Sequence, residues 1–404
     1  MSTVFMNTYH RLPVTFAKGD GAWLTDINGK KYLDFSSGIA VNCLGHNYPP
    51  LVKAISEQAA KYNHVCNYFS SDVSEAFAEK LVAACSGAAM KKVFLCNSGA
   101  EANEGACKIA RKYSLLKYGP GRHKIVTLRG SFHGRTITTL SATGQDALHK
   151  DFGPFTEGFV HVPAGDMDAL ERALDPKTTA GFLIEPIQGE SGIWPLDGEY
   201  GRSAAKLCAG RDILLMFDEI QAGLGRTGTF LACEAYDLQS LGLNPDLVTL
   251  AKGLCGGIPG AAVLAGEKTM DVFQTGDHGS TFGANPLAAA AGLVVLDTVN
   301  RSGFLKDISR KGEKFVSIIK GWKDPKVKEI RGRGLILGID IADDASDDAP
   351  GKAWPVLEKA VSAVNPGLLL LTAGKNTIRL LPPYIIKDEE IEMGLEILKG
   401  CLIL

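Results

Sequence analysis

The fold of this chain is decided by the stretch ILLMFDEIQ, residues 213–221. The apolar run Ile213–Phe217 is followed at once by the carboxylates of Asp218 and Glu219. A short apolar run bounded by polar residues is typical of a strand that is buried on both faces of a parallel sheet. In open sheets of this kind, ligands bind beyond the carboxyl ends of the strands. We therefore expect Asp218 at the binding edge of a sheet.

Six further runs of the same type lie before and after this stretch, at Lys92–Cys96, Lys124–Leu128, Gly158–Val162, Gly181–Ile184, Leu247–Leu250 and Ala261–Ala265. Helical patterns separate several of them, as at Glu101–Leu116 and Gly201–Ala209. Alternation of strands and helices predicts an α/β fold with a mainly parallel, seven-stranded sheet. We assign residues 50–290 to this large domain.

The two ends of the chain have other patterns. Gly21–Phe35 alternates like a β-hairpin with Asn28 and Gly29 at its turn. After residue 290, helix-like stretches precede the strand candidates Gly334–Ile341 and Thr377–Leu381. We expect a small α+β domain at residues 291–404, with residues 1–49 packed beside it.

Composition narrows the class of protein. The 404 residues are 45% apolar and 22% charged, and the formal net charge is -2, which is typical of a globular protein without nucleic acid or membrane as its main partner. The N-terminus lacks the pattern of a secretory signal. Nine cysteines occur with no CxxC pair, so we expect reduced, buried thiols, a cytoplasmic location and no metal site.

Lys252 follows the expected strand Leu247–Leu250 and precedes Gly253. A lysine held partly buried at a strand exit loses its proton easily and can form an imine with an aldehyde. Most lysines are solvated surface residues, and Asp218 could equally be a helix cap. Neither residue decides the function alone.

The segment Asn97–Glu104 follows a strand and opens a helix, with Ser98 and Glu101 at capping-box spacing. The N–H groups of Ser98, Gly99 and Ala100 could hold a phosphate, because helix N-termini attract anions. A plain capped helix explains the same residues.

Two loops carry further candidates. In the segment 130–136, Phe132 could stack on a planar ring and Arg135 could grip a carboxylate, although a surface loop fits as well. In the segment 278–286, hydroxyl groups between glycines suit a phosphate or a carboxylate.

Taken together and in order, six segments resemble the class III aminotransferases of fold type I, which use pyridoxal 5'-phosphate, over nearly the whole chain. They are NSGAEANE (97–104), SFHGRT (131–136), EPIQGESG (185–192), FDEIQAGLGRTG (217–228), AKGLCGGIPGAAV (251–263) and GSTFGANP (279–286). The resemblance implies that Lys252 is the Schiff-base lysine and that Asp218 pairs with the pyridine nitrogen. The other cofactor contacts that it implies are Ser98, Gly99, Ala100, Phe132, Glu219, Ile220, Gln221 and, from a second subunit, Thr281. A homodimer with shared active sites follows.

Within the class, the chain resembles the acetylornithine type most, through Asn7–Val14, Gly38–Asn42 and His64–Phe69. This implies ping-pong transfer of the δ-amino group of N-acetylornithine to 2-oxoglutarate, in arginine biosynthesis. The implied substrate contacts are Arg135 for the donor's α-carboxylate, Arg379 for a second carboxylate, Glu190 as a gate that pairs with Arg379, and Ser280 and Tyr9.

Alternatives remain on the same scaffold and outside it. Ornithine δ-, succinylornithine, succinyl-diaminopimelate and 4-aminobutyrate aminotransferases share the motifs. An aminomutase of the glutamate-1-semialdehyde type shares the lysine and the aspartate, but we expect no arginine there at the position of Arg135. A catalytically silent relative that acts as a binding protein is disfavoured by the intact Lys252 and Asp218. A dinucleotide-binding dehydrogenase is disfavoured because no GxGxxG links a strand to a helix.

Overall fold

The seven apolar runs form a single sheet in the computed structural model, which describes residues 4–341 and 351–402. The strands are β4 (Lys92–Cys96), β5 (Lys124–Leu128), β6 (Phe159–Val162), β7 (Thr179–Ile184), β10 (Leu214–Asp218), β11 (Leu247–Leu250) and β12 (Ala261–Ala265). Their order is β4-β12-β11-β10-β7-β5-β6. Strand β12 runs opposite to the other six, so the predicted, mainly parallel sheet is confirmed.

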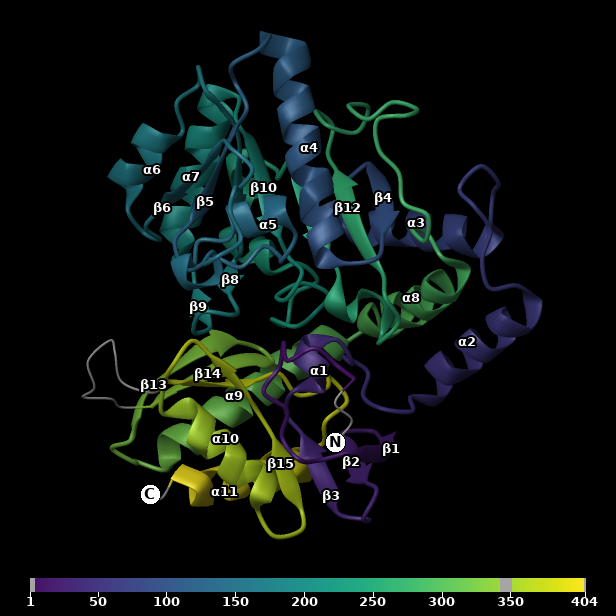
Figure 1. The fold of residues 1–404 in the computed structure, drawn as a ribbon, viewed down its shortest axis with the longest axis vertical. Helices are drawn as coiled ribbons and strands as arrows, with labels where there is room; N and C mark the ends of the chain where they lie inside the picture. The colour runs from purple at the N-terminus through teal and green to yellow at the C-terminus, as the bar shows by residue number, and fades with distance from the viewer. Residues whose placement is uncertain (1–3, 342–350, 403–404) are drawn as a thin grey trace.

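Both faces of this sheet are buried, which explains why the strands are apolar throughout. Leu214 and Met216 of β10 pack with the helix α4 (Gly99–Tyr118) on one face. Leu215 and Phe217 point to the other face and join the main core there. Side chains of a strand alternate between the two faces, so each face receives its own apolar set. Figure 1 shows α4 running along the sheet.

Further helices surround the sheet or connect its strands. The α-helices are α2 (Pro49–Lys61), α3 (Asp72–Ala84), α5 (Ile137–Ala142), α6 (Met167–Ala173), α7 (Gly198–Arg211) and α8 (Pro286–Val299). The 3-10 helices are η1 (Ser86–Ala88), η2 (Asp146–Leu148), η3 (Ala232–Tyr236), η4 (Leu238–Leu241) and η5 (Lys252–Cys255), and a short hairpin pairs β8 (Ile187–Gln188) with β9 (Trp194–Pro195). The expected domain limit at residue 290 falls inside α8.

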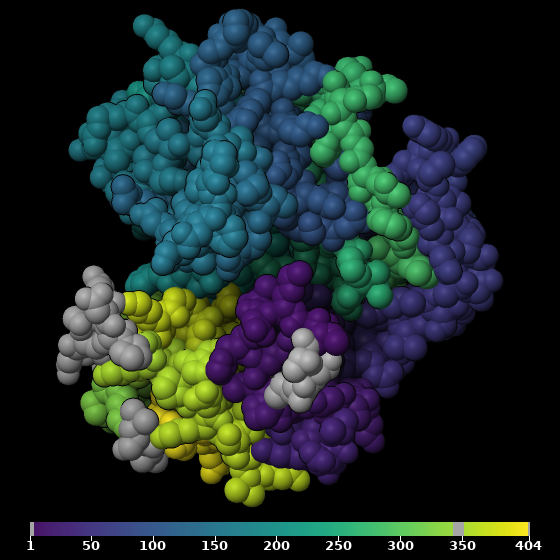
Figure 2. Space-filling model, in the orientation of Figure 1, coloured from purple at the N-terminus to yellow at the C-terminus, as the bar shows by residue number. Residues whose placement is uncertain are grey.

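The C-terminal part forms a second, smaller layer. An antiparallel sheet has the order β13 (Val327–Arg333), β14 (Ile336–Ile341), β17 (Thr377–Leu380), β16 (Leu371–Ala373). The helices α9 (Phe304–Gly321), α10 (Ala353–Ser362) and α11 (Asp388–Leu402) lie in the same part of the chain. The strands predicted at residues 334–341 and 377–381 correspond to β14 and β17. In Figure 2 the large domain, in blue and teal, lies above this yellow-green part.

The N-terminal segment contributes β1 (Phe16–Asp20), β2 (Trp23–Asp26), β3 (Lys31–Asp34) and α1 (Ser37–Ala40). The predicted hairpin is present: β2 and β3 pair antiparallel, and Gly29 has the positive φ of 85° that its turn needs. Strand β3 also pairs with β15 (Gly367–Leu369), so the two ends of the chain share a sheet. The exact limits of the three proposed segments stay predictions.

Eight of the nine cysteines are buried as free thiols, and Cys66 is exposed. Within residues 4–341 and 351–402, no helix combines the length and the apolar character that a membrane crossing needs.

Candidate active site

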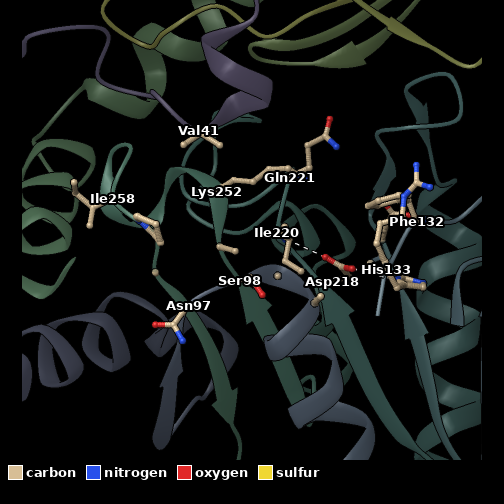
Figure 3. A pocket seen from close by; sticks show the side chains of 18 of the residues that line it. Val41, Asn97, Ser98, Phe132, His133, Asp218, Ile220, Gln221, Lys252 and Ile258 are labelled. Carbon is tan, nitrogen blue, oxygen red and sulfur yellow. Dashed lines mark hydrogen bonds and ion pairs between the residues drawn. The ribbon is translucent and has the colours of Figure 1, made fainter. Parts of the chain in front are cut away.

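A cavity of about 460 Å³ opens where five strands of the large sheet end. The chain leaves β4, β5, β7, β10 and β11 at the same edge, so segments far apart in the sequence meet there. Figure 3 shows their side chains around the cavity, with Val41 of the N-terminal segment on the opposite side. The cavity is lined by Val41, Asn97, Ser98, Gly99, Ala100, Phe132, His133, Gly134, Arg135, Glu185, Asp218, Ile220, Gln221, Ala251, Lys252, Gly257, Ile258, Pro259 and Gly260.

Lys252 stands just after β11, at the start of η5, with a positive φ of 46°. Side chains rarely adopt this conformation, which is typical of functional positions. The pKa of Lys252 is lowered from 10.5 to about 8, chiefly by burial and also by Arg379, while Asp218 and Glu185 oppose the shift. A much larger fraction of this amine is therefore neutral, and nucleophilic, near neutral pH than of an ordinary lysine.

Asp218 is the last residue of β10 and is buried. Its Oδ2 atom accepts hydrogen bonds from Nδ1 of His133 and from Nδ2 of Asn103, both at 2.8 Å. Its Oδ1 atom accepts from the backbone N–H of Ile220 at 3.0 Å. The three donors hold the carboxylate in one orientation at the cavity wall, where it can face a cation.

The N-terminus of α4 forms another part of the wall. Ser98 and Glu101 make the capping box that their spacing predicts, with Ser98 Oγ accepting from the N–H of Glu101 at 3.2 Å. The first N–H groups of a helix have no partner within it, so those of Gly99 and Ala100 are available to an anion. A Cβ on Gly99 would lie 2.8 Å from Cδ1 of Ile220, so this approach needs a glycine.

Phe132 and Arg135 lie beside the cavity on the loop after β5. The N–H of Phe132 donates to Oε2 of the buried Glu185 at 2.8 Å. The guanidinium carbon of Arg135 lies 5.5 Å from the centroid of the Phe132 ring, and the Arg135 side chain is exposed. Burial and, to a lesser extent, the nearby Asp218 raise the pKa of Glu185 well above its ordinary value. Because its side chain is exposed, Arg135 can meet a carboxylate at the cavity rim.

Arg379 is buried on β17 of the small sheet and does not line the cavity itself, but it contacts Gln221 of the lining. Its Nη1 atom donates to the carbonyl of Gly189 at 2.8 Å and to Oε1 of Gln221 at 3.3 Å, while its Nε atom has no hydrogen-bond partner among the described residues. Burial lowers the pKa of Arg379 to about 10, and Glu190 opposes this shift. An incompletely satisfied buried cation next to a cavity is suited to receive an anion.

The structure does not bring every expected residue to this cavity. Glu219 is buried elsewhere: its carboxylate accepts the N–H groups of Ala232 and Cys233 and supports η3. Ser280 and Thr281 line a separate hollow; of the described residues, Asn97 alone lines both hollows, and its Nδ2 donates to Ser280 Oγ at 3.0 Å. Tyr9 is exposed, and neither Tyr9 nor Glu190 lines either hollow.

The sequence does not predict a role for three residues at or near the cavity: His133, Asn103 and Glu185. Each lies inside one of the six family segments, but neither its type nor its spacing marks it there. Asn103 is one turn into a helix, and its contact with Asp218 depends on α4 packing across β10. The sequence predicts the position of Asp218, at the end of an apolar strand, but not which side chains bind its carboxylate.

Comparison with known proteins identifies the family. A model described as Aminotransferase class-III matches residues 4–402. The chain belongs to the class-III aminotransferases. An acetylornithine aminotransferase from Caldanaerobacter subterraneus subsp. tengcongensis is 44% identical over 400 residues, covering 98% of this chain and 96% of that protein.

Solved structures of class-III aminotransferases have the same fold. An N-acetylornithine aminotransferase from Stenotrophomonas maltophilia K279a is 38% identical with a TM-score of 0.81, covering 98% of this chain and 96% of that one. An ornithine aminotransferase from Toxoplasma gondii is 34% identical with a TM-score of 0.90, covering 99% of this chain and 92% of that one. The latter is described with partial occupancy of PLP at its active site.

Class-III aminotransferases depend on pyridoxal phosphate, and the residues of this cavity fit that group. The N-terminus of α4 suits its phosphate, Asp218 suits its ring nitrogen, and Lys252 suits its aldehyde. Within the described ranges, no cluster of three or more histidine, cysteine, aspartate or glutamate side chains is placed to hold a metal ion.

Proposed function

We propose that this aminotransferase binds pyridoxal 5'-phosphate and transfers the δ-amino group of N-acetylornithine to 2-oxoglutarate. The products are N-acetylglutamate 5-semialdehyde and glutamate, as required in arginine biosynthesis in a cytoplasm. One observation carries the proposal: two arginines lie at different depths, Arg135 exposed at the rim and Arg379 buried behind Gln221. The relatives named for acetylornithine support it.

The cofactor would be held by residues that already converge. The N–H groups of Gly99 and Ala100 would receive the phosphate, Asp218 would bind the ring nitrogen, and Phe132 would cover the ring. When bound, pyridoxal phosphate carries the amino group between the two half-reactions and withdraws electrons from the reacting carbon. The hydrogen bonds from His133 and Asn103 would keep the carboxylate of Asp218 oriented towards the ring nitrogen.

Lys252 has two roles in this proposal. Its Nζ atom would hold the cofactor through the aldehyde group, and the same atom would move a proton while a substrate is bound. A pKa of about 8 suits both steps, because a base works best when its pKa lies near the working pH. The positive φ of Lys252 directs the side chain from the strand end into the cavity.

The two arginines explain how one cavity serves two substrates. N-acetylornithine presents its δ-amine to the cofactor, so its carboxylate lies far away, where Arg135 would bind it. 2-Oxoglutarate presents a keto acid to the cofactor, so Arg379 would bind the near carboxylate and Arg135 the far one. Glu190 would pair with Arg379 during the first half-reaction and release it in the second.

We propose that the protein works as a homodimer with shared sites. Ser280 and Thr281 lie outside the cavity that holds Lys252, so they would serve the site of a partner subunit. Tyr68, Phe69 and Phe282, near that hollow in the chain or in space, are 95%, 72% and 60% exposed. Large exposed aromatic side chains are typical of a surface that another subunit covers.

A donor comparison tests the substrate. Purified protein with bound cofactor is mixed in turn with N-acetylornithine, ornithine, succinylornithine and 4-aminobutyrate, without any acceptor. The change in cofactor absorbance from the aldehyde to the amine form is then timed. We expect N-acetylornithine to react fastest. Ornithine is the second candidate, because the matched Toxoplasma gondii structure is an ornithine aminotransferase; a faster reaction with it would overturn the substrate assignment.

Hybrid dimers test the shared site. Lys252→Ala and Thr281→Glu should each disable every site in their own homodimer. In a mixed dimer, one site combines both defects and the other is intact, so mixing after mild dissociation should restore about a quarter of the wild-type activity. No recovery, with mixed dimers demonstrated by mass, would show that Thr281 serves its own subunit or no site.

A further inference from the structure

Arg226 is the largest fully buried side chain of the described residues, and it lacks a counter-ion. No carboxylate lies within 4.0 Å of its guanidinium in the described part of the chain. Its Nη1 atom donates to the carbonyl oxygens of Leu335, at 3.2 Å, and of Pro382. The guanidinium carbon lies 4.4 Å from the centroid of the Tyr384 ring, while Nε and Nη2 have no partner among the described residues.

A buried cation of this kind is costly. Removing a charged group from water costs several kcal/mol unless a partner compensates, and two carbonyls with one aromatic ring compensate only in part. Among the described residues, the side chain of Arg226 contacts none that lines the cavity, whereas Arg379 contacts Gln221 of that lining, so direct contact with substrate does not explain Arg226. We therefore look for the role of Arg226 in the parts of the fold that its contacts connect.

These groups belong to different layers of the molecule. Arg226 lies in the loop that follows β10, five residues after Gln221, whereas Leu335 and Pro382 flank strands of the small sheet. The contact is reciprocal: the N–H of Leu335 donates to the carbonyl of Arg226 at 2.8 Å. The hydroxyl of Tyr384 donates to the carbonyl of Leu224, in the same loop, at 2.9 Å. Hydrogen bonds donated from each of the two segments therefore connect the small domain to this loop.

The same two segments meet a second time at the cavity. Arg379 precedes Pro382 by three residues on β17, and its guanidinium donates to Oε1 of Gln221. The segments 221–226 and 379–382 therefore touch at both ends, at Arg226 with Pro382 and at Gln221 with Arg379. Any shift of the Arg226 contact would move Arg379 relative to the cavity.

We infer that Arg226 is a positioning residue that sets Arg379 at the height where it receives the near carboxylate of the keto-acid substrate. The inference rests on the proposed role of Arg379. It predicts an asymmetry between the two half-reactions, because only the keto-acid half uses Arg379 to bind substrate. The donor half uses Arg135, which the large domain holds independently of Arg226.

The test is Arg226→Met in the full-length protein with bound cofactor. The second-order rate constant for the cofactor's amine form with 2-oxoglutarate should fall about 100-fold, since displacement by about 1 Å of a group that orients substrate has this effect. The rate constant for the aldehyde form with N-acetylornithine should change less than about threefold. Calorimetry with glutarate, which has both carboxylates but no keto group, should show weaker binding by about tenfold or more.

Arg122→Met is the matched control. Arg122 is also a buried arginine that donates to backbone carbonyls, of Thr179 at 2.9 Å and of Asp212 at 2.7 Å, and lies over a tyrosine ring, but these contacts stay within the large domain. It should lower thermal stability without the asymmetry. If Arg226→Met does not fold, Arg226→Lys, which keeps the charge and can reach one carbonyl, carries the same test.

Equal losses in both half-reactions, or no loss, would overturn the inference, as would the same asymmetry in Arg122→Met. Failure of the proposed function would instead appear in the wild-type protein, as slow reaction with N-acetylornithine. The donor that reacts fastest would then replace N-acetylornithine in the comparison of the two half-reactions. Glutarate binding, which needs no donor, still compares Arg226→Met with the wild-type protein.

Discussion

The imidazole of His133 donates from Nδ1 to Oδ2 of Asp218 across 2.8 Å, and both side chains are buried. A carboxylate can only accept, which assigns the proton to Nδ1 of the imidazole. Nε2 of His133 is buried and has no partner in the described residues. The contact with Asp218 is therefore the one hydrogen bond of this imidazole among the described residues. A mutation of His133 should accordingly change the binding of the cofactor that Asp218 contacts.

His133→Ala should weaken the binding of pyridoxal phosphate by about 10- to 100-fold, because a hydrogen bond to a charged group contributes about 1.5–3 kcal/mol. The measurement is the cofactor dissociation constant, from absorbance titration of the apoprotein. Asn103→Leu removes the other donor to the same oxygen and should have a similar effect. Unchanged affinity in both variants would show that neither contact orients Asp218 for the cofactor.

Lys252→Met should stabilise the cofactor-free protein below about pH 8 and abolish turnover. The folded-state pKa of Lys252 is about 8, below its ordinary 10.5, so the unfolded chain binds more protons between these pH values. The wild-type free energy of unfolding therefore rises with pH across that window relative to the variant. The variant's advantage, on the order of 3 kcal/mol at neutral pH, should close towards pH 10.5. Urea denaturation measures it, with the exposed Lys53→Met as control.

Lys252→Ala addresses the chemistry rather than stability. The protein should still bind the cofactor through Asp218 and the N-terminus of α4, but it should not transfer amino groups. Absorbance of the dialysed protein and a product assay measure the two properties. Turnover at the wild-type rate would remove Lys252 from its role.

Arg135→Ala should lower kcat/KM for N-acetylornithine by about 10- to 100-fold, the contribution of a charge-assisted hydrogen bond to a carboxylate. Cofactor affinity should change little, because the guanidinium lies at the rim and reaches Phe132 only at 5.5 Å from its ring centroid. Arg135→Lys keeps the charge without the fork and should recover part of the loss. Donor kinetics that match the wild type would contradict the assignment.

Gly99→Ala should weaken cofactor binding, because its new Cβ would lie 2.8 Å from Cδ1 of Ile220 at the expected phosphate site. Gly198→Ala is the matched control: Gly198 is also the first residue of a helix, and a Cβ there would meet nothing within 4 Å. The dissociation constant of pyridoxal phosphate should rise about tenfold or more in the first variant only. Equal affinities would place the phosphate elsewhere.

Much of the large domain was predictable because its signals are local. Strands buried on both faces must be apolar throughout, so each appears as a short run between polar residues, and all seven were found. The capping box of Ser98 and Glu101 and the turn at Gly29 likewise depend only on neighbours in the chain. The order of the strands was not predictable, because any buried run can pair with any other.

By itself, the sequence determined the strand-and-helix alternation, the placement of Asp218 and Lys252 at strand ends, and the family. Only the tertiary structure decided that His133 and Asn103 hold Asp218, that Glu219 faces η3, and that Arg379 meets Gln221. These contacts join residues 85 to 158 positions apart, except for those of Glu219, which span 13 and 14 positions. Local patterns record which face of an element is buried, whereas partners across the fold depend on how whole elements pack.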